Sequence, residues 1–201
     1  SLVAGDTASF TQAYDTKNAG TGKTLTATGA VSDGNSGNNY AITFVPNPSG
    51  VITPRPLTVS AATDTKVYDA TTASGGVPAI TSGTLAGTDT ASFTQAYSNK
   101  DAGTGKTLNA AGSVNDGNAG NNYALVFISN TTGVITAAPL TVTADNKTRP
   151  ENTPNPPFTA TFSAFQPGDS ASSLGGTLVF ATPATPASAA GLYPITPSGV
   201  T

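Results

Sequence analysis

Four residue types are absent from the 201-residue chain: cysteine, histidine, methionine and tryptophan. Without cysteine the chain has no disulfide, no thiol nucleophile and no thiolate metal site. Without histidine it lacks the side chain that serves most often as a general base and as a metal ligand. These absences predict a protein that is not an enzyme and that has no catalytic and no cofactor-binding residues.

Charge and long apolar runs are also scarce. Charged residues make up 9% of the chain and the net charge is −3, whereas an ordinary globular domain has about 25% charged residues. No basic cluster is present that could neutralise nucleic-acid phosphates, and no apolar run approaches the roughly 20 residues that span a membrane. We therefore expect neither a nucleic-acid partner nor insertion into a membrane.

A glycine-rich stretch, "NAGTGKT" at 18–24, returns as "DAGTGKT" at 101–107 and looks like a phosphate-binding loop. That loop requires a glycine five residues before the glycine of its Gly-Lys pair, so that backbone N–H groups can surround the phosphates. Lys17 and Lys100 occupy this position. The residues that follow alternate as a strand does, whereas a phosphate-binding loop leads into a helix. The stretch therefore predicts a tight turn that leads into a strand.

The main feature of the sequence is an internal repeat with a shift of 83 residues. The segment "DTASFTQAY" occurs at 6–14 and again at 89–97, and "AGTGKTL", "GVIT" and "PLTV" recur at the same spacing. A period of this length corresponds to a whole small domain rather than to one coil of a solenoid. The sequence predicts a partial first repeat at 1–53, a complete second repeat at 57–136, and a third module of another type at 140–201 that lacks its last strand.

Alternation of apolar and polar residues predicts several strands. Residues 123–128 are apolar on both faces, so this strand is predicted to be central in its sheet. "SFTQAY" fits less well, because Gln95 falls on the same face as its apolar neighbours. Lys23 and Lys106 are predicted at the start of edge strands, where a lysine discourages pairing with another sheet. Asp169 is predicted to cap a short helical turn.

The pattern as a whole predicts a fold made of strands. Residues 57–61 and 107–114 each have one apolar face, which indicates half-buried strands, and no segment keeps a helical period for three turns. Roughly six or seven strands in about 80 residues are typical of a small β-sandwich. We expect an all-β fold, built as a tandem array of sandwich-like modules in an elongated rod, with Ig-like and β-grasp-like topologies as the alternatives.

Two Asp/Asn-rich turns are the candidate metal sites. Asp33 and Asn35 lie in "DGNSGNN", and Asp116 and Asn118 lie in "DGNAGNN". Calcium binds carboxylate, amide and backbone oxygens, but each turn supplies a single carboxylate and no closing glutamate. The alternatives are a calcium site and a plain turn in which the side chains bond the local backbone, and the plain turn is favoured.

The remaining candidates have structural interpretations as well. Tyr40 and Tyr123 are predicted to belong to the core rather than to a ligand platform, and Asp69 is predicted to be a turn residue rather than a catalytic acid. A covalent Lys–Asn crosslink is a further alternative, which requires a buried acid beside the pair.

"KVYDATT" at 66–72, "AGTGKTL", and "NNYAL" followed by "GVIT" resemble the YDG-type repeat of large bacterial adhesins, with Ala70 where the motif usually has glycine. Residues 140–201 resemble the related MBG-type module, with Arg149 and Pro150 in place of the usual Tyr-Gly. Such modules occur in filamentous-haemagglutinin-like exoproteins of Gram-negative bacteria. The resemblance implies export, commonly by two-partner secretion, and a location at the bacterial cell surface in a stalk or biofilm adhesin.

We therefore expect the non-catalytic stalk or spacer region of a secreted adhesin, made of monomeric modules. Its partners would be a host surface, matrix polysaccharide or other bacterial surface components, contacted through the parent protein. The alternative function is that one module, 140–201, is itself a glycan- or protein-binding module. An enzyme is the third class, which the absence of histidine and cysteine disfavours.

Overall fold

A computed structural model describes all residues from Ser1 to Thr201. The chain consists of fourteen strands and one short 3-10 helix, so the prediction of an all-β protein is confirmed. None of its helical residues forms a segment long and apolar enough to cross a membrane.

The chain divides into two compact units that do not follow the sequence repeats. Unit 1 contains Ser1–Ala62, Gly76–Gln95 and Asn109–Ser129, and unit 2 contains Thr63–Gly75, Ala96–Leu108 and Asn130–Thr201. The second repeat therefore contributes to both units. The three predicted modules and their arrangement as a rod stay predictions.

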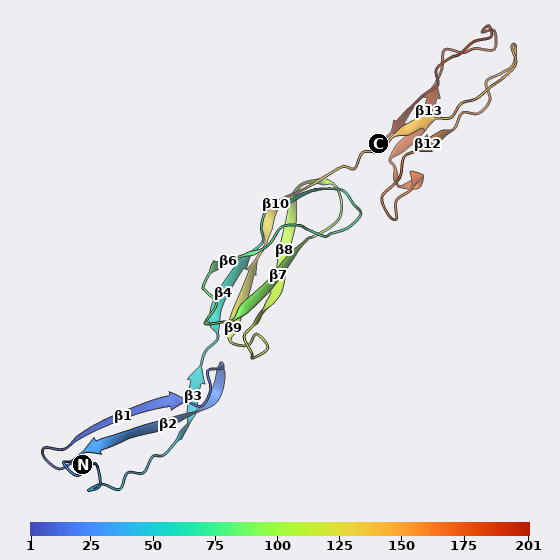
Figure 1. Cartoon of the computed structure of the whole chain (residues 1–201). Helices are drawn as coiled ribbons and strands as arrows, with labels where there is room; N and C mark the ends of the chain where they lie inside the picture. The colour runs from blue at the N-terminus through green and yellow to red at the C-terminus, as the bar shows by residue number, and fades with distance from the viewer. The chain divides into compact units, whose positions relative to one another are not determined.

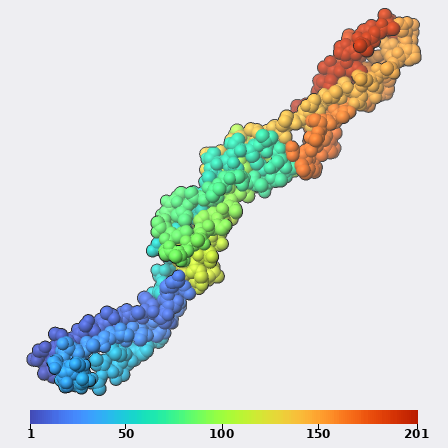
Figure 2. Space-filling view, viewed as in Figure 1, coloured from blue at the N-terminus to red at the C-terminus, as the bar shows by residue number.

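The first sheet of unit 1 is antiparallel and has the order β1-β2-β3, with the strands Thr7–Tyr14, Gly20–Ser32 and Asn47–Ile52. Figure 1 shows β1 and β2 side by side, and the residues of both lie in the blue part of Figure 2. The two strands pair from Thr7 opposite Ser32 to Tyr14 opposite Leu25. Lys23 lies on β2, the central strand, so its predicted edge position is wrong. A pattern of alternation along one strand says nothing about which strands lie beside it.

The second sheet of unit 1 has the order β6-β4-β9, with the strands Ala79–Ser82, Arg55–Ser60 and Tyr123–Ile128. Leu57 and Val59 on β4 are 1% and 0% exposed, which confirms the predicted alternation of this strand. Leu57 forms a core cluster with Val114 and Tyr123, against which Phe93 also packs. The core of unit 1 therefore depends on β4.

Strand β9 is an edge strand, which corrects the prediction that residues 123–128 are central. Tyr123 packs into the core, but Val126 and Ile128 point to solvent and are about half exposed. Both faces of the strand are apolar, yet only one is covered. Apolar residues on two faces therefore do not by themselves establish a central position.

A four-stranded sheet has the order β5-β10-β8-β7, with the strands Thr65–Val67, Asn130–Thr136, Gly103–Asn115 and Thr90–Tyr97. Lys106 lies on β8, between β10 and β7, so its predicted edge position is also wrong. The second repeat thus contains seven strands, from β4 to β10, in agreement with the predicted number.

The C-terminal part of unit 2 contains two strand pairs. Strands β11 (Val142–Ala144) and β12 (Ala160–Phe162) form one pair, and β13 (Gly176–Ala181) and β14 (Thr196–Val200) form the other. A 3-10 helix, η1, spans Ala171–Ser173 and begins after Ser170, which is its N-cap. The predicted cap, Asp169, is therefore one residue too early.

Candidate functional site

The two glycine-rich stretches form the beginning of the long central strands. Gly20 and Gly103 are the first residues of β2 and β8, and register shifts follow each of them. A strand thus stands where a phosphate-binding loop would require a helix. Lys106 Nζ donates to the side-chain oxygen of Asn99, which is exposed. The Lys–Asn crosslink, which requires a buried acid beside the pair, stays a prediction.

The first Asp/Asn-rich turn is organised by one carboxylate. Asp33 Oδ1 accepts the backbone N–H groups of Asn35 and Gly37 at 2.8 and 2.7 Å, and Oδ2 accepts that of Asn39 at 2.9 Å. Burial opposes ionisation of Asp33, but these backbone hydrogen bonds outweigh it and lower the pKa of the carboxyl. Both carboxylate oxygens are thus directed at backbone donors of their own turn.

The second turn repeats this geometry. Asp116 accepts the backbone N–H groups of Asn118, Gly120 and Asn122 at 2.7, 2.8 and 2.8 Å. Its pKa is also lowered, because these three bonds outweigh the effect of burial. Asp116 is 3% exposed. The identical bonding in both turns is the arrangement expected of an Asx-type turn.

Within unit 1 the second turn also contacts the beginning of the first glycine-rich stretch. Asn122 Oδ1 accepts the backbone N–H of Ala19 at 2.7 Å, and Asn122 Nδ2 donates to Asn18 Oδ1 at 3.3 Å. The backbone carbonyl of Asn122 accepts the N–H of Arg55 at 2.8 Å. We call these three contacts the Asn122 joint. Sequence reasoning missed it, because Asn18 and Ala19 are more than a hundred residues from Asn122, and none of these residues lies in an unusual pattern.

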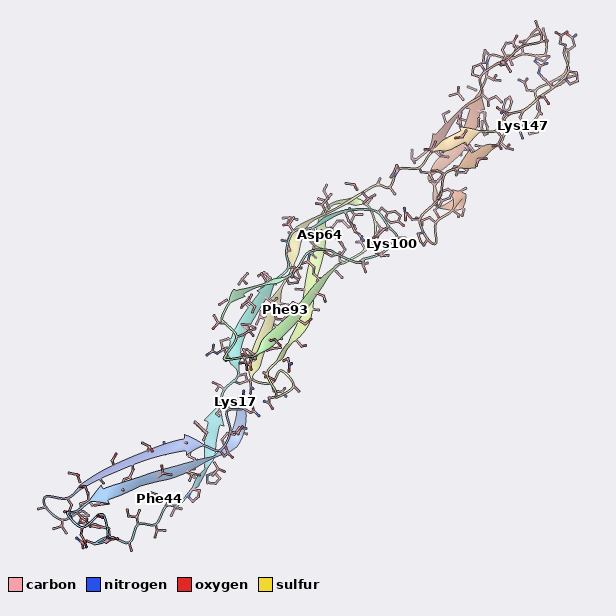
Figure 3. The ribbon with its side chains drawn as sticks, viewed as in Figure 1. Lys17, Phe44, Asp64, Phe93, Lys100 and Lys147 are labelled. Carbon is pink, nitrogen blue, oxygen red and sulfur yellow. The ribbon has the colours of Figure 1, made fainter.

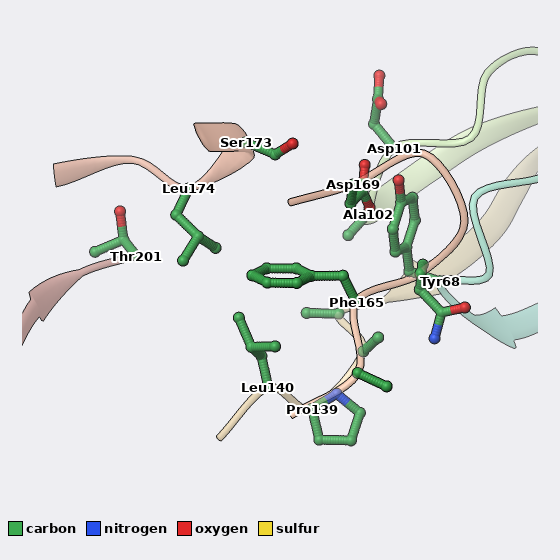
Figure 4. Close-up of a pocket in the computed structure, with 14 residues that line it drawn as sticks. Tyr68, Asp101, Ala102, Pro139, Leu140, Phe165, Asp169, Ser173, Leu174 and Thr201 are labelled. Atoms are coloured by element: carbon green, nitrogen blue, oxygen red, sulfur yellow. The ribbon is translucent and has the colours of Figure 1, made fainter. Parts of the chain in front are cut away.

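An open cavity of about 420 Å³ lies within unit 2. Figure 4 shows the ring of Phe165 between Leu140 and Leu174, with Tyr68 and Asp169 on the other side of the cavity. Asp101 and Ala102, from the second glycine-rich stretch, also line it. Sequence reasoning missed this site, because its residues come from five separate segments of the chain.

One basic side chain lies beside the polar end of this cavity. Lys100 Nζ lies 5.9 Å from the centroid of the Tyr68 ring. A hydrogen bond to the Tyr68 hydroxyl, and the neighbouring carboxylates of Asp169 and Asp101, raise the pKa of Lys100. The cavity thus has an apolar floor, and both acidic and basic side chains lie at its polar edge.

The "KVYDATT" motif forms a hydrogen-bonded turn around Lys66. Lys66 Nζ donates to Asp69 Oδ1 at 2.7 Å and to the carbonyl of Thr71 at 2.8 Å, and it lies 5.4 Å from the centre of the Tyr97 ring. The bond from Lys66, followed by those from Thr71, lowers the pKa of Asp69 to about 2. Ala70 has a φ of +63°, in the left-handed region that favours glycine.

Two segments of the chain match known domain families. Residues 53–133 match the YDG domain. Residues 140–201 match the MBG domain of the YGX type. Both domains are found in bacterial surface proteins. No curated protein matches the chain, and no solved structure matches it.

In the segment that matches the MBG domain, Arg149 connects two loops. Its Nε donates to Asn155 Oδ1 at 2.8 Å, and its terminal nitrogens donate to the carbonyls of Thr185 and Pro150. Glu151 accepts the N–H of Ala190 at 2.8 Å. The Arg-Pro pair that replaces the usual Tyr-Gly therefore holds the segments 149–155 and 184–190 together.

The calcium alternative stays a prediction. The structure contains no group of three or more acidic side chains close enough to hold a metal ion. Asp33 and Asp116 each stand with Asn35 and Asn118 in a turn, as the sequence suggested, but the amide nitrogens of these asparagines donate to Asn39 Oδ1 and Asn122 Oδ1 at 2.9 and 3.0 Å.

Proposed function

We propose that this chain is a non-catalytic spacer region of a secreted bacterial adhesin of the filamentous-haemagglutinin-like type. It holds a binding region away from the surface of a Gram-negative cell, for attachment or for biofilm formation. The parent protein contacts a host surface, matrix polysaccharide or other bacterial surface components through that region. The repeats themselves carry out no reaction and need no cofactor.

The observation that supports this proposal best is the Asn122 joint. A side chain of the YDG domain bonds directly to the backbone of the preceding repeat, at Ala19, with an N···O distance of 2.7 Å. A spacer requires consecutive modules that meet through defined contacts rather than through a loose linker, because only defined contacts maintain length. The family matches to domains of bacterial surface proteins are compatible with this function.

Small-angle X-ray scattering of the monomeric chain tests the spacer function. A compact globule of this length has a radius of gyration of about 17 Å. Modules placed end to end, each with strands of about 33 Å, are expected to give about 25–32 Å and a long tail in the distance distribution. A radius below about 20 Å would mean that the modules fold back on one another, and the spacer function would be rejected.

A second candidate function is supported by the cavity in unit 2. Its aromatic floor, Phe165, and its carboxylates, Asp101 and Asp169, are groups that commonly bind a sugar or a peptide. On this view the segment 140–201 is itself a glycan- or protein-binding module. A glycan array probed with the whole chain would show specific binding that Phe165→Ala abolishes. No binding on the array, or binding that survives Phe165→Ala, would remove the cavity as a glycan site.

A further inference from the structure

Strand β9 gives the second repeat one long sheet edge without a partner. It pairs with β4 on one side, and no strand lies beside it on the other. It lies inside the segment 53–133, which matches the YDG domain, and the chain continues on both sides of that segment. The free edge is therefore a property of the repeat itself.

The backbone groups of alternate β9 residues point away from β4. The N–H of Ala61, which follows β4, donates to the carbonyl of Ile128 at 2.9 Å, so the backbone of Ile128 faces β4. Backbone groups alternate in direction along a strand, and the pairing with β4 has no register shift. The N–H and C=O groups of Leu125 and Phe127 are therefore directed at the free edge.

The side chains of β9 divide between an inner and an outer face. Tyr123 belongs to the core cluster and Leu125 packs against it. The ring of Phe127 meets that of Phe93, which is labelled in Figure 3, edge to face at 6.1 Å. The side chains of the outer face are apolar and exposed: Ala124, Val126 and Ile128. A strand added at the free edge would extend the inner face and cover part of the outer one.

The other edge strands of the second repeat are short or partly covered. Strands β5 and β6 have three and four residues. Strand β7 is covered at its end, where Ala96 pairs with Ala73 and the N–H of Tyr97 donates to the carbonyl of Thr72 at 2.9 Å. Natural sheets protect their edges by short strands, by covering segments, and by charged residues or proline. Strand β9 has six residues, none of which is charged or proline, and it has none of these protections.

We propose that the free edge of β9 is a self-association site, at which β9 of a second copy of this chain pairs with it in the antiparallel direction. We call this site the β9 edge and define it by residues 124–128. The two-fold axis passes beside Val126, so Val126 lies opposite Val126 of the second copy, and Leu125 lies opposite Phe127. The β6-β4-β9 sheets of the two copies then become one continuous sheet.

This register uses all the backbone groups that Leu125 and Phe127 direct at the edge. Each Leu125 exchanges two hydrogen bonds with Phe127 of the other copy, because directly opposite residues of an antiparallel pair bond in this way. Tyr123 lies outside the pairing. Its N–H already donates to the carbonyl of Gly120 at 3.1 Å, so it is not needed at the edge.

A second copy fits the β9 edge better than an unlike strand does. The outer face of β9 has no charged or polar side chain that could select an unlike partner. Against its own copy, Ala124 lies opposite Ile128, so a small side chain meets a large one, and the two Val126 side chains, each 52% exposed, cover each other. No charge on either strand has to be desolvated. Because each β9 has one free edge, the association closes at two copies.

Disulfide trapping in the whole chain tests the register, because the chain has no cysteine of its own. Residues opposite each other without mutual hydrogen bonds have Cα atoms about 4.5 Å apart in an antiparallel pair, a distance that a disulfide can span. We therefore expect Val126→Cys to form a linked dimer in a glutathione redox buffer. Reduction of the disulfide should return the monomer.

Ala124→Cys is the matched control on the same face. In the proposed register the two copies of position 124 lie about 14 Å apart along the strands, too far for a disulfide. Ala124→Cys alone should therefore link at least about tenfold more slowly than Val126→Cys. A mixture of Ala124→Cys with Ile128→Cys should link faster than either variant alone, because these two positions lie opposite each other.

Hydrogen exchange of the unsubstituted chain tests the pairing without cysteine. A contact of this size is weak, so the chain is compared at about 10 μM and at about 1 mM. Exchange at the amides of Leu125 and Phe127 should slow by about threefold or more at the higher concentration, because these amides enter hydrogen bonds. The amide of Val126 faces β4 and should not change.

A lysine on the β9 edge should prevent the association. Val126→Lys places two like charges opposite each other, so exchange at Leu125 and Phe127 should no longer depend on concentration. Val77→Lys is the control, because Val77 is 73% exposed and lies outside the strands. This variant should keep the dependence on concentration.

Three outcomes would overturn the proposal. Equal linking of Val126→Cys and Ala124→Cys would mean that the copies meet by random collision. A mixture of Ala124→Cys and Ile128→Cys that links no faster than the single variants would exclude the register. Exchange at Leu125 and Phe127 that does not depend on concentration would mean that no second copy occupies the edge. None of these results changes the scattering of the dilute monomer, so failure of this proposal and failure of the spacer function are distinguishable.

Discussion

Ala70 is the residue at which the YDG motif of this chain departs most clearly from the usual pattern. Its φ of +63° lies in the left-handed region, which costs a residue with a Cβ about 1–2 kcal/mol. A glycine there would remove this strain but would add about 0.5–1 kcal/mol of unfolded-state entropy. We therefore expect Ala70→Gly to raise the free energy of unfolding by about 0.5 kcal/mol, measured by urea denaturation.

Ala79→Gly is the control for this substitution. Ala79 lies exposed in strand β6 and does not have a positive φ. The same chemical change should therefore lower the free energy of unfolding, by about 0.5–1 kcal/mol. A loss of equal size in both variants would show that the turn at Ala70 is not strained.

The carboxyl of Asp69 makes the same turn sensitive to acid. Its pKa is lowered from 3.8 to about 2, first by the hydrogen bond from Lys66 and then by those from Thr71. A carboxyl with a lowered pKa stabilises the fold fully above its unfolded pKa, and this stabilisation is lost as the pH falls through the folded pKa. We expect the turn to open between pH 3.8 and about 2. An NMR titration of the Asp69 carboxyl carbon checks this, and a midpoint near the ordinary value would contradict it.

Gly112 determines how closely β8 can lie against β7. Its φ is +144°, and a Cβ at this position would lie 2.1 Å from the carbonyl oxygen of Ser92 and 2.8 Å from Phe93. Gly29 has the same environment on β2. Since backbone atoms cannot move aside as a flexible side chain can, Gly112→Ala should destabilise the chain by roughly 1–3 kcal/mol or more in urea denaturation.

Gly75→Ala is the control for Gly112→Ala. A Cβ at Gly75 meets no atom within 4 Å, and the residue has no positive φ. The substitution should therefore be neutral or stabilise by about 0.4–1 kcal/mol, through the unfolded chain. Equal destabilisation by the two substitutions would mean that close approach of the backbones is not the reason for glycine at position 112.

The strands themselves were largely predictable, and their neighbours were not. The alternation of Leu57 and Val59 predicted a half-buried strand, because side-chain direction is a local property of the chain. Which strand lies at an edge depends on distant segments, and the prediction was wrong for Lys23, for Lys106 and for β9. Gln95 made the prediction of β7 weaker, because it is a polar residue on the apolar face of that strand. Its amide bonds the backbone of Ala62, and a pattern of apolar and polar residues cannot predict such a partner.

The same limit applies to the candidate sites. The Asx turns at Asp33 and Asp116 were predictable, because an Asp or Asn side chain bonds backbone groups only a few residues away. The Phe165 cavity and the Asn122 joint were not, because both depend on contacts between segments far apart in the sequence. Hydrogen bonds within a turn can be predicted from the sequence, whereas a site that is built from distant segments can be found only once the fold is known.

At the scale of the whole molecule, the Asn122 joint is a contact between the first two sequence repeats, and both sides of it lie within unit 1. Asn122 and its repeat equivalent, Asn39, have the same bonding inside their own turns, because each accepts a hydrogen bond from the asparagine four residues before it. Only Asn122 also accepts the N–H of Ala19. The comparison of Asn122→Ala with Asn39→Ala therefore isolates the contact between repeats from the stability of the turn.

We expect Asn122→Ala to speed hydrogen exchange at the amide of Ala19. The variant removes the three hydrogen bonds of the Asn122 side chain, to Ala19, Asn18 and Asn118. Only the first of them protects the amide of Ala19, and its net value of about 0.5–1.5 kcal/mol corresponds to an increase of roughly 2- to 12-fold in the exchange rate. The turn should persist, because the bonds from the Asn122 backbone to Asp116 and from Arg55 to the Asn122 carbonyl do not involve the side chain. Asn39→Ala should leave the amide of Ala19 unchanged. If the two variants changed exchange at Ala19 equally, the repeats would not be coupled through Asn122, and the spacer function would lose the contact that supports it best.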